Sequence, residues 1–214
     1  MALVVSRLYV ILDSELCGGA EVKIASELQR AGARFFQYRN KNAPARELLQ
    51  TSRQLADTLI PLGAAFFVND RPDVAYLADA SGVHLGQDDL RADEARAMLG
   101  SERFVGVSTH NFEQFRAAVK TTADYIAVGP IFPTSTKKRP DPVVGTELLK
   151  ELRPLTRKPI VAIGGITLER AREVIEAGAD SVAVISDILR APNPAERARN
   201  YLNVLETARP IAAE

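Results

Sequence analysis

The segment that decides the fold spans residues 160–186 and reads IVAIGGITLERAREVIEAGADSVAVIS. It opens and closes with two short apolar runs, Ile160–Ile163 and Ser181–Ile185, which are typical of parallel strands buried on both faces. Leu168–Ala177 lies between them and carries apolar residues at three- and four-residue steps, as a helix with one buried face does. Gly178 follows that helix and favours a turn into the next strand. The segment therefore predicts one strand–helix unit and the strand that begins the next.

The same unit recurs along the whole chain. Six further apolar runs are the expected strands Leu8–Leu12, Phe35–Tyr38, Ala65–Val68, Gly82–Leu85, Phe104–Val107 and Tyr125–Val128. Segments rich in Ala, Leu, Glu and Arg are the expected helices Glu21–Ala31, Arg46–Ile60, Val74–Ala78, Ala92–Met98, Phe112–Lys120, Glu147–Leu152 and Pro194–Glu206. Eight such units are the number found in a (β/α)8 barrel, whereas doubly wound sheets usually have fewer strands. We predict an α/β fold, a single-domain (β/α)8 TIM barrel over residues 1–214, with a frayed tail from about Arg209.

Composition narrows the classes of partner. The chain has 214 residues, enough for one sizeable core, and its formal net charge of +0 gives no general attraction to nucleic acid or to an anionic membrane. Cys17 is the single cysteine, so no disulfide can form within the chain, which favours a reducing, cytoplasmic setting. No apolar stretch approaches the roughly 20 residues of a membrane span. A barrel of this size is compatible with a homodimer.

Polar residues and glycines gather after the expected strands. Active sites of (β/α)8 barrels lie at the C-terminal ends of the strands, so these residues converge on one rim. The candidates are Gln37, Arg39, Lys41, Asn69, Asp70, Asp89, Ser108, Thr134, Gly165 and Ser186. We therefore expect a polar, ligand-binding opening at that rim.

The second strand carries the clearest signal. Side chains alternate between faces, so Gln37 and Arg39 lie on one side while Phe36 and Tyr38 lie on the other. The rings pack against helices, which directs Gln37 and Arg39 into the opening, with Lys41 just beyond. A buried arginine needs a partner, and an anion such as pyrophosphate would bind its forked guanidinium. The alternative is that Arg39 pairs with a neighbouring carboxylate and covers the core.

Two aspartates follow adjacent strands. Asp70 and Asp89 can face one another across the opening, and two carboxylates with phosphate oxygens and water suit Mg²⁺. The alternative is ordinary capping, because aspartate is common at turns and at helix starts. Either aspartate alone would favour capping, and it is the pair that raises the metal hypothesis.

Two turns match the usual phosphate site of these barrels. Gly164-Gly165 follows the seventh strand and Ile185-Ser186 follows the eighth, where backbone N–H groups can bind an oxyanion. Glycine permits that close approach, although a tight left-handed turn would require glycine as well.

One loop and two histidines complete the candidates. Pro133–Gly145 has three prolines and no helical period, which predicts a long loop over the opening, a candidate lid. Its Lys137 and Lys138 could neutralise phosphate or could be solvated. His84 lies inside an apolar strand and is expected to be a satisfied core residue. His110 lies at a strand end and is open to either interpretation.

These motifs together resemble the thiamine-phosphate synthase family. The matching motifs are Gln37-Tyr38-Arg39-Asn40-Lys41, Asn69-Asp70, Gly82-Val83-His84-Leu85-Gly86-Gln87-Asp88-Asp89, Gly106-Val107-Ser108, Gly129-Pro130-Ile131-Phe132-Pro133-Thr134-Ser135-Thr136-Lys137-Lys138, Ile163-Gly164-Gly165-Ile166 and Val184-Ile185-Ser186. The likeness runs from about Leu8 to Tyr201. The run at 129–138 and the Gln-x-Arg-x-Lys pattern are specific to this family and its close relatives, whereas the Gly-Gly turn is shared with many phosphate-binding barrels.

The resemblance implies a transferase reaction with small-molecule partners. Hydroxymethylpyrimidine diphosphate and a thiazole phosphate would join to give thiamine phosphate and pyrophosphate, with Mg²⁺ as cofactor. By resemblance, the diphosphate would be bound by Gln37, Arg39, Lys41, Asn69 and Lys137. The metal ligands would be Asp70 and Asp89. The thiazole phosphate would be bound by Thr134, Thr136, Gly165, Ile185 and Ser186. Ser108 would lie near the pyrimidine amino group, and we assign catalytic roles to Ser108, Lys137 and Arg39.

Three other functions compete with this one. A thiazole tautomerase on the same barrel would use a general acid/base such as His110 and would not need a diphosphate clamp. A sugar-phosphate isomerase or aldolase would use Lys137 as base or Schiff-base amine. A non-catalytic protein that binds thiazole or pyrimidine phosphates would have no use for the aspartate pair or Ser108.

Overall fold

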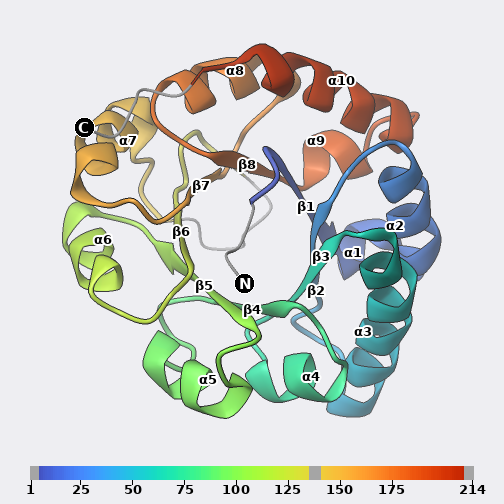
Figure 1. Ribbon diagram of the computed structural model, residues 1–214. Coiled ribbons are helices and arrows are strands. Elements are labelled where there is room, and N and C mark those ends of the chain that lie inside the picture. Colours follow the sequence, from blue (N-terminus) through green and yellow to red (C-terminus); the bar gives the residue numbers. More distant parts are fainter. Residues whose placement is uncertain (1–4, 135–140, 210–214) are drawn as a thin grey trace.

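The computed structural model describes residues 5–134 and 141–209, and these form a closed barrel of eight parallel strands in chain order. Figure 1 looks along the barrel and shows the ring of strands surrounded by helices. The strands are β1 (Leu8–Asp13), β2 (Phe35–Arg39), β3 (Ala65–Asn69), β4 (Gly82–Leu85), β5 (Phe104–Thr109), β6 (Tyr125–Val128), β7 (Ile160–Ile163) and β8 (Ser181–Val184). The predicted fold class is confirmed, and β8 closes the ring by pairing with β1.

The outer layer consists of the helices that connect the strands. They are α2 (Glu21–Arg30), α3 (Ala45–Leu59), α4 (Pro72–Leu77), α5 (Ala92–Leu99), α6 (Phe112–Val119), α7 (Gly145–Leu152), α8 (Leu168–Glu176) and α10 (Pro194–Thr207). Four short helical segments were not predicted, namely α1 (Ser14–Cys17), α9 (Ser186–Leu189) and the 3-10 helices η1 (Ile60–Leu62) and η2 (Arg153–Leu155). Segments of three or four residues are too short to show a helical period.

Four strands are longer than predicted, and one is shorter. β1, β2, β3 and β5 continue into polar residues because their backbones still pair with a neighbour: Asp13 lies opposite Arg39, and Asn69 lies opposite His84. The prediction ended these strands where the apolar run ended. β8 ends at Val184, and Ile185 leaves the ladder to precede α9.

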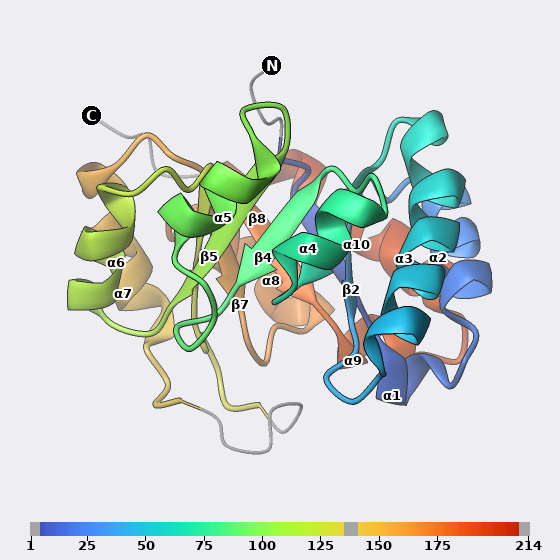
Figure 2. The same cartoon turned by 90° about the horizontal axis from the view of Figure 1, so that it is seen from below.

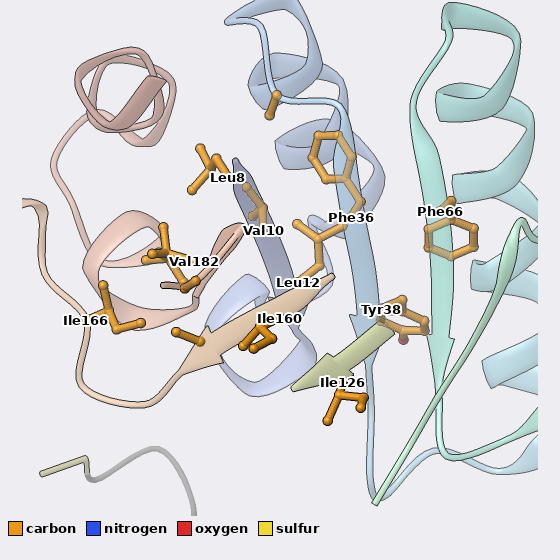
Figure 3. Packing of buried hydrophobic residues seen from close by; sticks show 14 of the residues in the cluster. Leu8, Val10, Leu12, Phe36, Tyr38, Phe66, Ile126, Ile160, Ile166 and Val182 are labelled. Carbon is orange, nitrogen blue, oxygen red and sulfur yellow. The ribbon is translucent and has the colours of Figure 1, made fainter. Parts of the chain in front are cut away.

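Two apolar clusters result from the alternation of side chains along the strands. The larger cluster lies between the barrel and its helices, and Figure 3 shows Val10, Phe36 and Phe66 among its members. The smaller cluster fills the barrel interior with Tyr9, Ile11, Phe35, Phe67, Tyr125, Ala127, Val161 and Ala183. The predicted outward packing of Phe36 and Tyr38 is therefore confirmed.

The two ends of the barrel differ. The side view in Figure 2 places α1 and α9 at its lower end, directly after the C-terminal ends of β1 and β8. The predicted tail is represented only by Arg209, which follows α10, and residues 210–214 lie outside the described part of the chain. Among the described residues, no helix is both long enough and apolar enough to cross a membrane.

Candidate active site

A pocket of about 820 Å³ opens among the C-terminal ends of the strands. The predicted site residues that line it are Gln37, Arg39, Lys41, Asn69, Asp70, Asp89, Ser108, Thr134, Gly165, Ile185 and Ser186. Thr136 and Lys137 lie outside the described residues, as do Ser135 and Lys138 of the predicted lid. Pro133, Thr134 and Asp141, from the two described flanks of that loop, also line the pocket. The strand ends thus bring together residues that are up to 149 positions apart, from Gln37 to Ser186.

Arg39 is held at the pocket wall by a carboxylate that sequence reasoning missed. Its Nη1 lies 2.5 Å from Oδ2 of Asp13, the last residue of β1, and Asp13 is only 3% exposed. The alternative weighed for Arg39, a neighbouring carboxylate as partner, is therefore present. The Arg39 side chain stays 24% exposed and lines the pocket, so the ion pair fixes the guanidinium without removing it from the opening. The signal that was available is the polar end of the first strand, directly opposite Arg39.

Asp70, Asp89 and Lys41 form a second charged group. Lys41 Nζ makes an ion pair with Oδ2 of Asp70, and the carboxyl groups of Asp70 and Asp89 share a hydrogen bond. Oδ2 of Asp89 also accepts a 2.7 Å bond from the backbone N–H of Gly86. Burial, followed by the contact with Asp70, raises the pKa of Asp89 above its usual range. The two carboxyl groups repel one another when both are ionised, and the ion pair of Lys41 with Asp70 offsets only part of that repulsion.

The backbone at Asp70 is unusual. Its φ of 64° lies in the left-handed region, which aspartate tolerates better than most side chains, and its N–H donates to the carbonyl oxygen of His84 over 2.8 Å. In the described chain no group of three or more His, Cys, Asp or Glu side chains could hold a metal. The protein would supply two oxygen ligands, and a hard cation would take the others from water and substrate.

The predicted phosphate turn is tightly packed. Gly164 and Gly165 have φ values of 100° and 62°, and a Cβ on Gly165 would lie 2.4 Å from the carbonyl oxygen of Pro133. Glycine is required here both by conformation and by space. Arg170 also lines this end, where its Nη1 donates to the carbonyl oxygen of Gly165 over 3.2 Å. Arg190, which follows α9, is a further cation on the pocket lining and was not among the predicted site residues.

The floor of the pocket is a hydrogen-bonded group of polar side chains. His84 Nε2 lies 2.8 Å from Ser108 Oγ, and His84 Nδ1 lies 2.8 Å from the hydroxyl of Tyr125. Tyr9 lies 3.1 Å from Tyr125 through their hydroxyls, and Gln37 Nε2 donates to Tyr9 over 2.8 Å. His84 is thus a satisfied core residue, as expected, but its partner Ser108 is a predicted substrate contact.

The two histidines differ in environment. Burial lowers the pKa of His84 to about 4, so its imidazole is neutral near pH 7. His110 lines the pocket; its Nδ1 lies 2.6 Å from the carbonyl oxygen of Gly129, and its Nε2 lies 3.5 Å from Asp141 Oδ2. Because His110 lines the pocket, the geometry permits it to act as a general acid or base there.

Known proteins resemble this chain over nearly its whole length. Residues 8–188 match the family model described as thiamine monophosphate synthase. A thiamine-phosphate synthase of Koribacter versatilis (strain Ellin345) is 50% identical over 207 residues, covering 94% of this chain and 96% of the relative. A thiamine-phosphate synthase of Shouchella clausii (strain KSM-K16) is 41% identical over 203 residues, covering 94% and 97%.

Solved structures give the same result. A thiamine phosphate pyrophosphorylase from Pyrococcus furiosus has a TM-score of 0.86 and 36% identity, covering 94% of this chain and 96% of that chain. The relatives are named as synthases, so the predicted class of enzyme, a transferase, is confirmed. The family that the motifs predicted is thus found by whole-length sequence and by fold, and the chain belongs to the thiamine monophosphate synthase family.

Proposed function

We propose that this chain is a thiamine-phosphate synthase, which joins hydroxymethylpyrimidine diphosphate to hydroxyethylthiazole phosphate and releases pyrophosphate. The observation that carries the proposal is one pocket that collects the cations Arg39 and Lys41, the contacting pair Asp70 and Asp89, and the turn at Gly165. Two phosphorylated substrates need two anion-binding regions at one opening, and the cations after β2 together with the turns after β7 and β8 would supply them.

The diphosphate end is built on β2 and β3. Arg39 can present a forked guanidinium while Asp13 holds it, and the amides of Gln37 and Asn69 add donors beside it. Lys41 contacts Asp70 and is half exposed, so its ammonium can reach a bound phosphate. Fixed donors of this kind stabilise charge on a leaving group without reorganisation, a contribution of several kcal/mol.

Asp70 and Asp89 are the residues that would hold Mg²⁺. A carboxylate pair with a raised pKa at Asp89 fits a cation between its members, and magnesium commonly keeps waters and substrate phosphates as its other ligands. When bound, the ion would neutralise charge that develops on the departing pyrophosphate.

The thiazole phosphate end is built on the turns after β7 and β8. Gly165 has no side chain to block the backbone, and Ile185 and Ser186 begin α9 at the same wall of the pocket. Backbone N–H groups at such turns are suited to phosphate oxygens. Arg170 and Arg190 add positive charge at this end.

The chemistry needs orientation more than a protein nucleophile. The bond between the pyrimidine methylene carbon and the diphosphate oxygen breaks, and the oxygen keeps the electron pair. The thiazole nitrogen then forms the new C–N bond to that carbon. Arg39 and Lys41 stabilise the departing charge, and Ser108 orients the pyrimidine at the floor of the pocket. Holding both substrates in reacting geometry supplies much of the remaining acceleration.

The direct test measures both products. The protein is incubated with the two substrates and Mg²⁺, and thiamine phosphate and pyrophosphate are quantified together. We expect stoichiometric release, loss of activity with a chelator, and a fall of at least about 100-fold in kcat/KM for Arg39→Gln and Asp70→Asn. Arg39→Gln retains an N–H donor for Asp13, which limits damage to the fold.

Matched controls separate charge at the site from charge elsewhere. Arg172→Gln and Asp57→Asn change the same residue types on the outer helices α8 and α3, and neither residue lines the pocket. Both should keep wild-type rates. A folded wild-type protein that forms no product would contradict the proposal and would direct the assay to tautomerisation of a thiazole phosphate with His110, or to binding alone.

A further inference from the structure

An interior network of side-chain hydrogen bonds crosses the barrel from β2 to β5. It runs from Gln37 to Tyr9 over 2.8 Å, from Tyr9 to Tyr125 over 3.1 Å, from Tyr125 to His84 over 2.8 Å, and from His84 to Ser108 over 2.8 Å. The first four residues are between 0% and 7% exposed, whereas Ser108 is only partly buried. The network therefore lies inside the barrel beneath the pocket, and Ser108 is its most exposed member.

Counting the hydrogens that each side chain carries assigns one donor and one acceptor to every hydrogen bond in the network. Gln37 directs its amide N–H at the Tyr9 oxygen, so the single hydroxyl hydrogen of Tyr9 is left to bind Tyr125. Tyr125 then donates its hydrogen to Nδ1 of His84, which acts as acceptor. A neutral imidazole with Nδ1 as acceptor carries its hydrogen on Nε2, and that hydrogen faces Ser108 Oγ.

We propose that this network makes His84 a positioning residue, fixed as the Nε2–H tautomer, which donates to Ser108 and leaves the serine's own hydroxyl hydrogen free for the ligand. The consequence for the ligand rests on the proposed function, in which Ser108 contacts the pyrimidine. The tautomer of His84 does not rest on the proposed function, because it follows from contacts within the protein alone.

Burial couples the members of the network. Reversing one bond while the others stay would leave a buried donor or acceptor without a partner, at a cost of about 1–3 kcal/mol. Gly106 makes room for the network, because a Cβ at that position would lie 2.0 Å from Cζ of Tyr125. The direction chosen by Gln37 at one end is therefore transmitted to Ser108 at the other.

His110 provides an internal reference. The sequence contains two histidines, so an imidazole spectrum of this protein has two sets of signals. His110 Nδ1 faces the carbonyl oxygen of Gly129, which can only accept, so Nδ1 of His110 must carry a hydrogen. When neutral, the two histidines should therefore be opposite tautomers.

Long-range ¹H–¹⁵N correlation spectra of the ¹⁵N-labelled full chain test the proposal. We expect His84 to show a protonated Nε2 and an acceptor Nδ1 at about pH 7.5, with His110→Gln used to assign its signals. A protonated Nδ1 on His84 would reverse every bond in the network and overturn the proposal.

Tyrosine variants test whether the network sets the tautomer. Tyr125→Phe removes the hydrogen given to Nδ1, so we expect the His84 signals to shift toward a mixture of tautomers. Tyr38→Phe is the matched control, because Tyr38 is also buried but packs on the helix side of the barrel and contacts Asn40. If both variants leave His84 unchanged, the network does not hold the imidazole, and the proposal fails.

Kinetics separate positioning from general damage to the core. His84→Gln can place an amide N–H near Ser108, so it should keep kcat/KM within about tenfold of wild type, whereas His84→Leu should lose as much as Ser108→Ala. Combining His84→Leu with Ser108→Ala should cost no more than either alone. Additive losses would contradict the positioning role. Absence of turnover in every form would refute the proposed function and leave the tautomer measurement valid.

Discussion

At the scale of single residues, the ion pair of Asp13 and Arg39 shows how a ligand-binding cation is kept in place. Asp13 is nearly inaccessible, while Arg39 reaches the pocket. The two residues are therefore unequal members of the pair. Removing the arginine leaves a buried carboxylate with its charge unpaired, but removing the aspartate leaves a cation that can still reach water.

This inequality predicts an order of stabilities. Arg39→Ala should lower the free energy of unfolding by about 3 kcal/mol, and Asp13→Ala by at least about 1 kcal/mol less. Urea unfolding of the two variants and of the double variant measures the order. The double variant should recover part of the loss of Arg39→Ala, and a larger loss for Asp13→Ala would show that the arginine depends on the aspartate more than the reverse.

His84 gives a prediction on pH. Its pKa falls from the usual 6.5 to about 4 in the folded chain because burial disfavours the charged imidazole. Between these values the unfolded chain binds the proton and the folded chain does not, so stability falls as the pH falls below 6.5. We expect His84 to cost about 2 kcal/mol at about pH 5.

The comparison of wild type with His84→Gln isolates that effect. Unfolding in urea is measured for both proteins at about pH 7.5 and about pH 5. The wild type should lose about 2 kcal/mol more than the variant on acidification, because the carboxylates are common to both. Equal losses would mean that His84 is protonated as readily in the folded state as in the unfolded state.

At the scale of elements, the sequence predicted all eight strands, but it did not predict that four of them continue into polar residues. Apolar runs mark the part of a strand that is buried on both faces, whereas Asp13 and Asn69 are paired by backbone bonds to neighbours that no local pattern reveals. The short helices α1 and α9 were missed for a related reason, since four residues carry no period.

The candidate site was predictable to a similar extent. Residues within two positions of a strand end, such as Lys41 and Asp70, can be placed at the rim from sequence because a parallel barrel brings all strand ends to one side. His84 was expected to be a satisfied core residue, but its hydrogen-bond partner Tyr125, and Tyr9 beyond it, could not be identified because all three lie inside strands. Their contacts depend on the registers of β4 with β5 and of β5 with β6, and on the closure of the barrel, which brings Tyr9 of β1 to Tyr125.

Strand β5 contains Gly106, which leaves space for the Tyr125 ring of the neighbouring strand β6. A Cβ on Gly106 would overlap the Tyr125 ring, so Gly106→Ala should cost about 3 kcal/mol or more. Gly63→Ala is the control: Gly63 has a φ of 76° but nothing within 4 Å, so only backbone strain of about 1 kcal/mol is expected. Thermal or urea unfolding compares the two, and equal losses would contradict the close contact.

At the scale of the whole molecule, rings from distant strands meet on the barrel axis. Tyr9 stacks on Phe35 at 3.6 Å between centroids, and Tyr125 contacts Tyr9, Phe35 and Phe67 edge-on. Because β1, β2, β3 and β6 all contribute, neither half of the barrel keeps its interior without the other. The described barrel should therefore unfold as one cooperative unit.

Spectroscopy can check this cooperativity directly. The sequence has no tryptophan and five tyrosines, so tyrosine fluorescence reports on Tyr9 and Tyr125 together with three tyrosines outside the barrel axis. Fluorescence and far-UV circular dichroism should give coincident urea transitions. A tyrosine transition at clearly lower urea than the loss of helix would indicate that side-chain packing is lost before the helices unfold, and it would contradict unfolding as one unit.

The same rings determine how ligands can enter and leave the pocket. Tyr9 and Phe35 close the axis of the described barrel beneath the opening, which makes the pocket a dead end. Whatever reaches the floor at Ser108 must pass the rim first, and whatever then occupies the rim blocks its return. Two molecules that share such a site arrive in sequence, the inner one first, and the outer position must clear before the inner one can empty.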